Sequence, residues 1–477
     1  TLAHYEPFDI AEPSRDKFFI SSLPITYDFN GFSVTSVSGF WSRRSLQKQD
    51  GTEQMQTLFG TPSFDPALGG TGPVQVYETD YSRQFSQELR VASTGSGPLK
   101  WLGGAFYSQY YTRYLIGVAS APEAASVFGS SDLVTGVIAT DIKQNAVFGN
   151  LTYEITPKLK AEAGLRYFRY EDSNILTTSG VVYGAVPPAP PQVSVAGGSN
   201  SGINPMFNVS YSPGPNSMIY ATASKGFREG GGNYYIPTSD ASPIGPGCLA
   251  DLQAIGLNSA PLQYGPDSVW NYELGEKSQF FKNRLQVNAD AYYIRWSRVQ
   301  SFVLLGAPES CNMYFTDNGA DATVKGGELE FKALLGAHLE LSQNVGYAYA
   351  AYSSSDPAAG IVEGQKLYDV PQWTVSTSLR YERPIGRVNF VAMVENSFQS
   401  NLQELTYQVF TLPSRDLVNV RVGLTTPAWS AFIFVDNALD RHFPLEYVNL
   451  ITQTGPDYSR IATNQPLTAG VDLSYNF

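Results

Sequence analysis

The sequence predicts an all-β fold, a large antiparallel transmembrane β-barrel, from its composition, its period-two alternation and the arrangement of its turns. Charged residues make up 16% of the 477 residues, against about 25% in an average soluble domain, whereas aromatic residues make up 13%. No uninterrupted apolar run reaches the roughly 18 residues of a transmembrane helix, and the sequence likewise predicts no attached signal peptide. A surface poor in charge and rich in aromatic residues therefore indicates contact with lipid through strands.

Alternation of apolar and polar residues identifies individual strands. In residues 467–477, apolar side chains at odd positions alternate with polar or small ones at even positions. The same period of two runs through residues 373–382 and 285–293. A period of two places one set of side chains on each face of a sheet, so these segments are predicted to be strands.

The connections between strands are of two alternating kinds. Short turns rich in Pro, Gly and Asn recur near Asn30, Gly97, Pro157, Pro213, Asn283, Gly336, Gly386 and Pro427. Longer polar or Gly/Pro-rich segments separate the hairpins, at residues 45–75, 117–140, 178–200, 229–266, 306–320, 353–370, 404–414 and 442–465. A soluble sandwich does not require this asymmetry, whereas an outer-membrane barrel has short periplasmic turns and long extracellular loops.

The predicted strand count is odd. Eight hairpins supply sixteen strands and residues 467–477 supply one more, which makes about 17 visible strands. Bacterial single-chain barrels have an even number, and residues 1–14, with two prolines, are a poor strand candidate. We therefore expect either further strands upstream of Thr1 or one miscounted strand. The start at Thr1 without Met also suggests a processed or truncated N-terminus.

Several motifs, in a shared order over most of the chain, resemble the barrel domain of TonB-dependent outer-membrane receptors. The strongest is DSVWNYELGEK at 267–277, followed by LQVNADAYYIRW at 285–296. The others are VTSVSGF at 34–40, QELRVAS at 87–93, YATASKGFREGGGN at 220–233, VKGGELE at 324–330, VDNALD at 435–440 and the terminal Phe477.

This resemblance implies a barrel of 22 strands around an N-terminal plug, with import of a scarce, bulky nutrient powered by the TonB complex. Residues 1–477 would then be an N-terminally incomplete barrel domain, because neither a plug nor a TonB box is found in the sequence. The expected cargo is a siderophore, a glycan fragment or a similar solute. The expected partners are outer-membrane lipid, the TonB complex through the missing N-terminal region, and an extracellular small-molecule ligand. A passive diffusion porin and an outer-membrane enzyme are the alternatives.

Charge and histidine content argue against other functions. The net charge of −12 disfavours nucleic-acid binding, which needs a basic surface. The histidines His4, His338 and His442 lie in different regions, without metal-ligand spacing or a Ser-His-Asp grouping. No catalytic residue, metal ligand or cofactor is therefore predicted, and haem uptake is disfavoured.

The two cysteines are predicted to form a disulfide. Cys248 and Cys311 lie in consecutive long loops on the same side of the membrane, because two strands separate them. The cell surface and the periplasm are oxidising, which favours a bond between the two loops. Two free thiols are the alternative.

Candidate ligand contacts lie at the barrel mouth, in the long loop at 229–266. Arg228 precedes a glycine cluster, Asn233, Tyr234 and Tyr235 follow it, and Tyr264 lies later in the loop. The tyrosines could stack on a sugar or an aromatic ligand. Alternatively, the glycines only let the strand bend into its loop. A phosphate-binding loop is disfavoured, since the Gly-Lys-Ser/Thr ending is missing.

Overall fold

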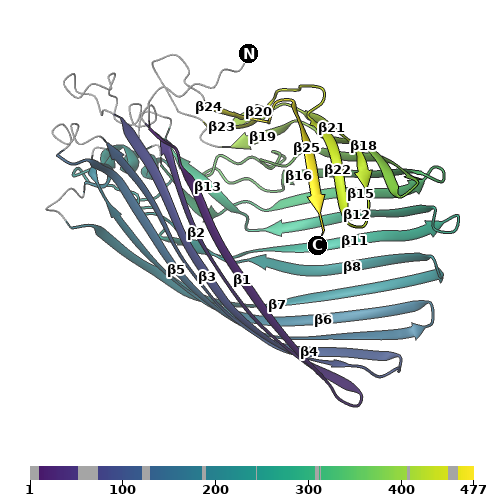
Figure 1. Cartoon of the computed structure of the whole chain (residues 1–477). Coiled ribbons are helices and arrows are strands. Elements are labelled where there is room, and N and C mark those ends of the chain that lie inside the picture. Colours follow the sequence, from purple (N-terminus) through teal and green to yellow (C-terminus); the bar gives the residue numbers. More distant parts are fainter. Residues whose placement is uncertain are drawn as a thin grey trace.

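The computed structural model describes residues 10–51, 73–120, 129–184, 190–242, 244–306, 311, 313–405, 409–448 and 460–476. A 17-stranded antiparallel sheet curls round on itself (Figure 1). His4, Phe477 and parts of seven of the predicted long loops fall outside the described residues. Within the described part of the chain, no helix is both long and apolar enough to cross a membrane.

The sheet contains the number of strands that the hairpin count predicted. In chain order its strands are β1 (Ser14–Asp28), β2 (Phe32–Asp50), β3 (Val74–Ser93), β4 (Leu99–Ser120), β5 (Asp132–Thr156), β6 (Leu159–Ser179), β7 (Gln192–Gly214), β8 (Ser217–Arg228), β11 (Asp267–Phe280), β12 (Leu285–Ser297), β15 (Ala322–Leu334), β16 (Leu339–Tyr352), β17 (Trp373–Ile385), β18 (Val388–Gln399), β21 (Arg415–Thr425), β22 (Trp429–Asp436) and β25 (Thr468–Tyr475).

Each of these strands pairs with the next one along the chain, so the topology is a simple up-and-down meander. Among the described residues no pairing joins β1 to β25, which are the two edges of the sheet. Hairpin turns are short on one side, as predicted. Gly386, with φ +63°, and Asn283, with φ +65°, adopt there the left-handed conformation that tight turns require.

The long connections on the other side carry smaller elements of their own. These are η3 (Val181–Tyr183), β9 (Gly231–Gly232), α3 (Gly245–Ala254), β10 (Gln263–Tyr264), β13 (Gln300–Leu305), β14 (Met313–Asn318), β19 (Leu402–Leu405), β20 (Val409–Leu412), β23 (Pro444–Val448) and β24 (Arg460–Thr463). The eight short strands among them form four two-stranded sheets, β9–β10, β13–β14, β19–β20 and β23–β24.

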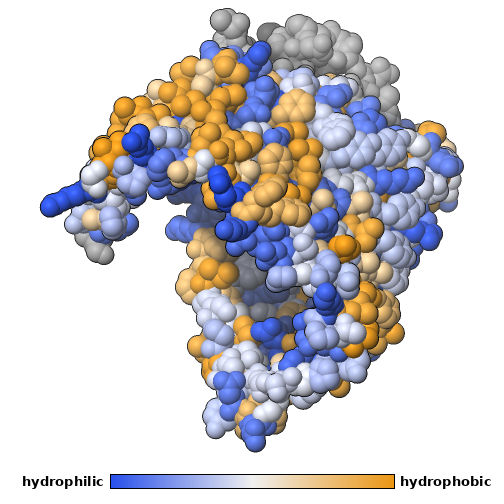
Figure 2. Space-filling model, turned by 90° about the vertical axis from the view of Figure 1, so that its right-hand side faces the viewer, coloured by the Kyte–Doolittle hydropathy of each residue, from blue (hydrophilic) through white to orange (hydrophobic). Residues whose placement is uncertain are grey.

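Alternation along each strand separates a lipid face from a lumen face. On β6 the outward side chains of Leu165 and Tyr167 are 53% and 46% exposed, whereas the inward Phe168 and Tyr170 are 4% and 2% exposed. Figure 2 shows orange apolar side chains gathered in patches on the outside and blue side chains around the hollow. An apolar outer face against a polar lumen is the pattern of a barrel that spans a membrane.

Candidate ligand-binding site at the long-loop mouth

The glycine-rich segment after β8 folds across the lumen face of the neighbouring strands. The backbone N–H of Gly230 donates to the Tyr170 hydroxyl on β6 at 3.3 Å. A Cβ on Gly230 would lie 2.2 Å from the carbonyl oxygen of Tyr264, and one on Gly231 would lie 2.4 Å from the Tyr264 hydroxyl. These glycines allow β9 and β10 to pack closely against each other, which agrees with the alternative reading that they shape the loop.

Arg228, a predicted ligand contact, forms an ion pair with Asp267. The Arg228 Nε and Nη2 lie 3.1 and 2.5 Å from Asp267 Oδ2. The Asp267 side chain is 2% exposed and that of Arg228 is 51% exposed. The guanidinium also lies over the Trp296 ring, 5.3 Å from its centroid. Arg228 therefore neutralises a buried carboxylate and presents only its outer part to the mouth.

Asn233 is engaged with the protein itself. Its Nδ2 donates to the carbonyl oxygens of Pro261 and Thr316 at 3.0 and 2.8 Å. Its Oδ1 accepts the backbone N–H of Thr316 at 2.8 Å. With both donors used and the side chain 5% exposed, Asn233 fastens the loop to β14, and its predicted contact with a ligand stays a prediction.

Tyr234 lies in a group of phenols at the mouth. Tyr114 on β4, Tyr183 in η3, Tyr314 on β14 and the Glu78 carboxylate on β3 are its electrostatic neighbours. Burial, followed by these neighbours, raises the pKa of Tyr234, and burial raises the pKa of Tyr183 to about 12. Among the described residues the buried Tyr234 hydroxyl has no hydrogen-bond partner. These phenols are neutral at physiological pH, so they can donate hydrogen bonds and stack without adding charge.

Tyr264 and Tyr235 are both partly buried. Burial raises the pKa of Tyr264, and the nearby Arg228 partly opposes this effect. The structure therefore brings Arg228 and Tyr264 together beside β10, whereas Tyr234 lies with phenols from other strands. The residues that sequence reasoning missed are Glu78, Tyr114, Tyr183 and Tyr314. They come from segments far apart in the chain, and no local motif marks them.

Helix α3 and the β13–β14 hairpin form a small folded unit beside these side chains, which we call the cap. The cap contains both cysteines. Cys248 on α3 and Cys311, 63 residues later, form a disulfide. Their sulfurs belong to a buried cluster with Ile236, Leu252, Val303, Leu305 and Phe315. The disulfide and this apolar cluster together attach α3 to the β13–β14 hairpin.

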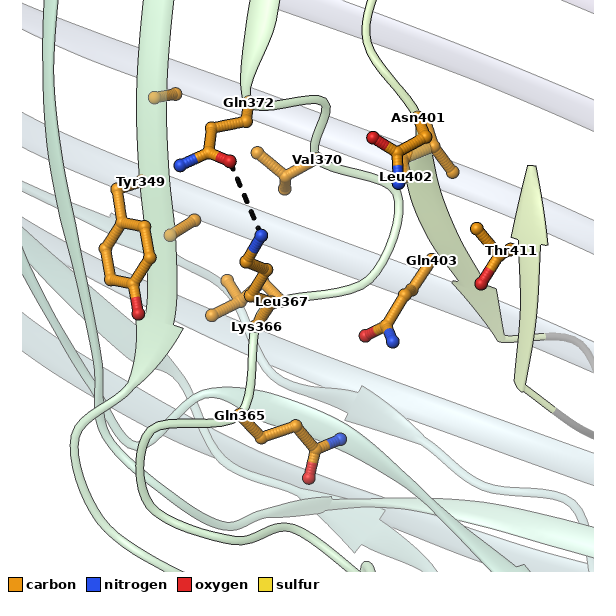
Figure 3. A pocket seen from close by; sticks show the side chains of 12 residues that line it. Tyr349, Gln365, Lys366, Leu367, Val370, Gln372, Asn401, Leu402, Gln403 and Thr411 are labelled. Carbon is orange, nitrogen blue, oxygen red and sulfur yellow. Dashed lines mark hydrogen bonds between the residues drawn. The ribbon is translucent and has the colours of Figure 1, made fainter. Parts of the chain in front are cut away.

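A separate cavity of 410 Å³ lies where β16 meets the segment before β17 and the β19–β20 hairpin. Figure 3 shows side chains from these elements facing a common space, with the Lys366 ammonium directed at Gln372. The Lys366 Nζ and Gln372 Oε1 are 3.4 Å apart. Polar side chains dominate the lining, namely Tyr349, Gln365, Lys366, Gln372, Asn401, Gln403 and Thr411. Such amides and hydroxyls suit a ligand rich in hydrogen-bonding groups.

Neither the mouth nor the cavity shows a group of metal ligands. In the parts of the chain that the structure describes, no three His, Cys, Asp or Glu side chains are placed to hold a metal ion. His442 instead lies 3.3 Å from the Asp440 carboxylate. The described arrangement offers hydrogen bonds and aromatic surface for binding.

The fold, with its apolar outer face, polar hollow and long loops on one side, is that of an outer-membrane β-barrel. A family model described as "TonB dependent receptor-like, beta-barrel" matches residues 7–438. The chain therefore belongs to the TonB-dependent receptor family, whose barrels are integral proteins of the bacterial outer membrane.

Solved structures show the same fold. The ferric yersiniabactin uptake receptor FyuA from Yersinia pestis aligns with a TM-score of 0.73 and 15% identity over 99% of this chain and 63% of that chain. The siderophore receptor PiuA from Acinetobacter baumannii gives 0.66 and 13%, over 97% and 64%. The ferric citrate transporter FecA gives 0.62 and 12%, over 98% and 62%. The chain thus spans less than two thirds of the length of these three proteins.

Proposed function

We propose that this chain forms the barrel wall of an outer-membrane receptor that imports a bulky, scarce nutrient, with energy from the TonB complex. The observation that carries the proposal is the family match over residues 7–438. A metal chelate such as a ferric siderophore is the cargo class we favour. FyuA, PiuA and FecA are receptors or transporters for siderophores or ferric citrate, and the phenols and amides at the mouth of this chain suit a polar chelate.

In this proposal the plug and the TonB-contacting segment come from residues outside this sequence. The intact mass of the mature protein, purified from native outer membranes, tests this against the 52.1 kDa of the chain. An excess of roughly 15–30 kDa, on the order of a plug plus several strands, is expected. A mass near that of the chain would instead favour a passive diffusion porin, which would show stable ion conductance in a planar bilayer.

Uptake in cells tests the energy coupling. A strain whose other receptors for ferric chelates are deleted is grown under iron limitation on a panel of chelates, with the mature protein supplied. Growth on one chelate is expected with TonB present and is expected to be lost when TonB is deleted. Growth that continues unchanged without TonB would contradict the proposal. No catalytic step is part of it, and turnover of ester or peptide substrates by the purified protein would favour the enzyme alternative.

The cavity near β19 offers a test within this chain. Ala348 lines the cavity on β16, so Ala348→Leu places extra side-chain volume there. If the cavity receives part of the cargo, uptake falls while the amount of folded barrel in the membrane stays the same. An exposed alanine distant from the cavity, Ala163 on β6, gives a matched control as Ala163→Leu.

A further inference from the structure

The outer surface of strands β1 to β6 carries a row of exposed basic side chains, which we call the basic row. It consists of Lys17, Arg44, Arg83, Arg113, Lys143 and Arg169, one from each strand in turn, and all are exposed. Their positions have the same parity as the outward apolar residues of their strands, for example Arg83 with Phe85 and Leu89, which are 44% and 48% exposed. The basic row therefore faces away from the lumen.

Strand register shows that the basic row runs obliquely across the strands. Starting from Lys17, direct cross-strand partners lead through Arg44, Tyr81, Arg113 and Ala139 to Ile175 on β6. The basic residue on β6 is Arg169, six residues nearer the short-turn end than Ile175. Along the strands the row shifts by six residues of about 3.3 Å each, and across the strands it spans five spacings of about 4.8 Å each. The row is therefore inclined by about 40° to the direction perpendicular to the strands.

This angle equals the strand tilt of a membrane barrel, which is about 35–45° from the barrel axis. A line that crosses tilted strands at this angle lies parallel to the membrane plane. A line at this angle could slope either way across the strands, and only one of the two slopes is parallel to the membrane. The apolar residues on the short-turn side of the row show which slope it is. They follow the same slope.

At the two ends of the basic row, on β1 and β6, the next outward apolar residues toward the short turns follow the same slope. Phe19 on β1 is 56% exposed, and its direct cross-strand partners lead to Ser173 on β6. The outward apolar residue on β6 is Tyr167, which is 46% exposed. Tyr167 lies six residues nearer the short-turn end than Ser173, which is the same offset as in the basic row. Phe19 and Tyr167 are each two residues from Lys17 and Arg169. The basic row therefore lies about 5–7 Å beyond the apolar band, on the long-loop side, at the level of lipid headgroups.

Among the described residues, the basic row has few ion pairs. On the lumen face, two of the cations pair with carboxylates, namely Arg43 with Asp16 and Lys332 with Glu340. In the basic row, Arg169 pairs with Glu171 at 2.9 Å, and the other five have no ion pair among the described residues.

Aromatic rings hold two of these unpaired cations in place. Arg44 and Arg83 lie over the rings of Tyr81 and Tyr111, 4.9 and 5.4 Å from the centroids. These contacts leave the planar guanidinium edges free to bind phosphate through paired N–H groups. On a chain with a net charge of −12, a band of cations that mostly lack ion pairs among the described residues suits an anionic neighbour.

We propose that the basic row binds the phosphate groups of anionic lipids in the outer leaflet, and so forms a lipid-headgroup site on the outside of β1 to β6. The occupant is a phosphorylated glycolipid whose acyl chains pack on the apolar band directly below. Basic side chains at a membrane surface strengthen binding to anionic headgroups roughly additively. The site is independent of cargo transport through the lumen, and its test does not depend on the proposed function.

Native mass spectrometry of the full chain, released from mixed micelles, counts the lipids that stay bound. The probes are a bisphosphorylated glycolipid of the lipid A type and its dephosphorylated form. The wild-type protein is expected to retain the bisphosphorylated form selectively. The quadruple variant Arg44→Gln, Arg83→Gln, Arg113→Gln and Lys143→Gln is expected to retain this lipid at least about ten-fold less than the wild type.

A matched control removes four positive charges at the short turns. Lys158, Lys282, Arg284 and Arg387 are exposed at that end of the barrel, and their replacement by Gln is expected to leave retention unchanged. Circular dichroism of all three proteins verifies equal strand content. Equal retention by the outer-row variant and the wild type would overturn the proposal, as would an equal loss in the control or equal retention of the dephosphorylated lipid.

Discussion

The Arg228 guanidinium lies directly opposite the Asp267 carboxylate in the register of β8 and β11, and its Nε and Nη2 donate to the same oxygen. Asp267 is 3% exposed and accepts a further hydrogen bond from the backbone N–H of Gln300 at 3.3 Å. This pair connects the sheet to the β13 end of the cap, at the place where the long loop leaves the barrel.

Arg228→Met is expected to destabilise this loop, because it leaves a buried carboxylate without its cation. The local cost is about 1–3 kcal/mol, at the lower end because Arg228 is half exposed. Hydrogen exchange of the amides in β9 and β10 measures it. The double variant with Asp267→Asn is expected to recover most of the protection. If the single variant exchanges like the wild type, the ion pair does not stabilise the loop.

Removal of the disulfide is expected to loosen the cap rather than the barrel. Cross-linking a free loop of 63 residues is worth at most about 4 kcal/mol, and the strands between the two loops already hold them near each other. Cys248→Ser with Cys311→Ser should therefore speed proteolysis within residues 244–260 and leave the strands protected. Reductant should affect the wild type in the same way and have no further effect on the double variant. Equal proteolysis of oxidised and reduced protein would contradict this expectation.

Glu229 is expected to make the loop less stable as the pH rises. Burial, and then the nearby Asp172, raise the pKa of the Glu229 carboxyl above its usual value. The folded loop thus favours the protonated form, and its stabilising effect is full below the unfolded pKa of about 4.5. This contribution is lost as the pH rises through the higher folded value.

Glu229→Gln tests this dependence, since Gln can still accept the hydrogen bond that Gln144 donates at 3.2 Å. The amide of Asn233, which donates to the Leu262 carbonyl at 2.8 Å, is the reporter for hydrogen exchange corrected for intrinsic rates. The variant should protect this amide better than the wild type at pH 8 and equally at pH 4. The exposed Glu363 provides the control, because Glu363→Gln should not change protection at either pH.

Gly230→Ala is expected to separate β9 from β10. The new methyl group would lie 2.2 Å from the Tyr264 carbonyl oxygen, and the backbone there cannot move without breaking the short ladder. Overpacking of this kind costs about 1–3 kcal/mol. Gly97→Ala, in a short turn where nothing lies within 4 Å of the added atom, is the matched control. Faster exchange in β9 and β10 of Gly230→Ala alone is the expected result, and no difference would show that the loop can adapt.

The sheet could be predicted from the sequence because its determinants are local. Alternation at 285–293 and 373–382 is the pleat itself, since consecutive side chains must face lipid and lumen in turn. The turns near Asn283 and Gly386 could be placed because few residue types adopt a left-handed backbone. A meander adds each strand to the preceding one, so the strand order follows directly from the hairpins.

The mouth could be predicted only in part. Arg228 and Tyr264 were chosen for their place in a long loop, but the sequence does not show that Asp267 neutralises Arg228 or that Asn233 binds the backbone of Thr316. The phenols around Tyr234 come from β3, β4, η3 and β14, which the curvature of the sheet and the folded cap bring to one place.

The sequence by itself determined the strands, their order, the side of the long loops and the face of each side chain, because these follow from spacing along one chain. The tertiary structure alone decided which side chains from distant strands meet, including the phenols at the mouth and the basic row. The physical reason is the tilt of the strands. Tilt shifts each strand along its neighbour, so residues at one membrane level occupy different places in their strands, and no local pattern reveals that they share a level.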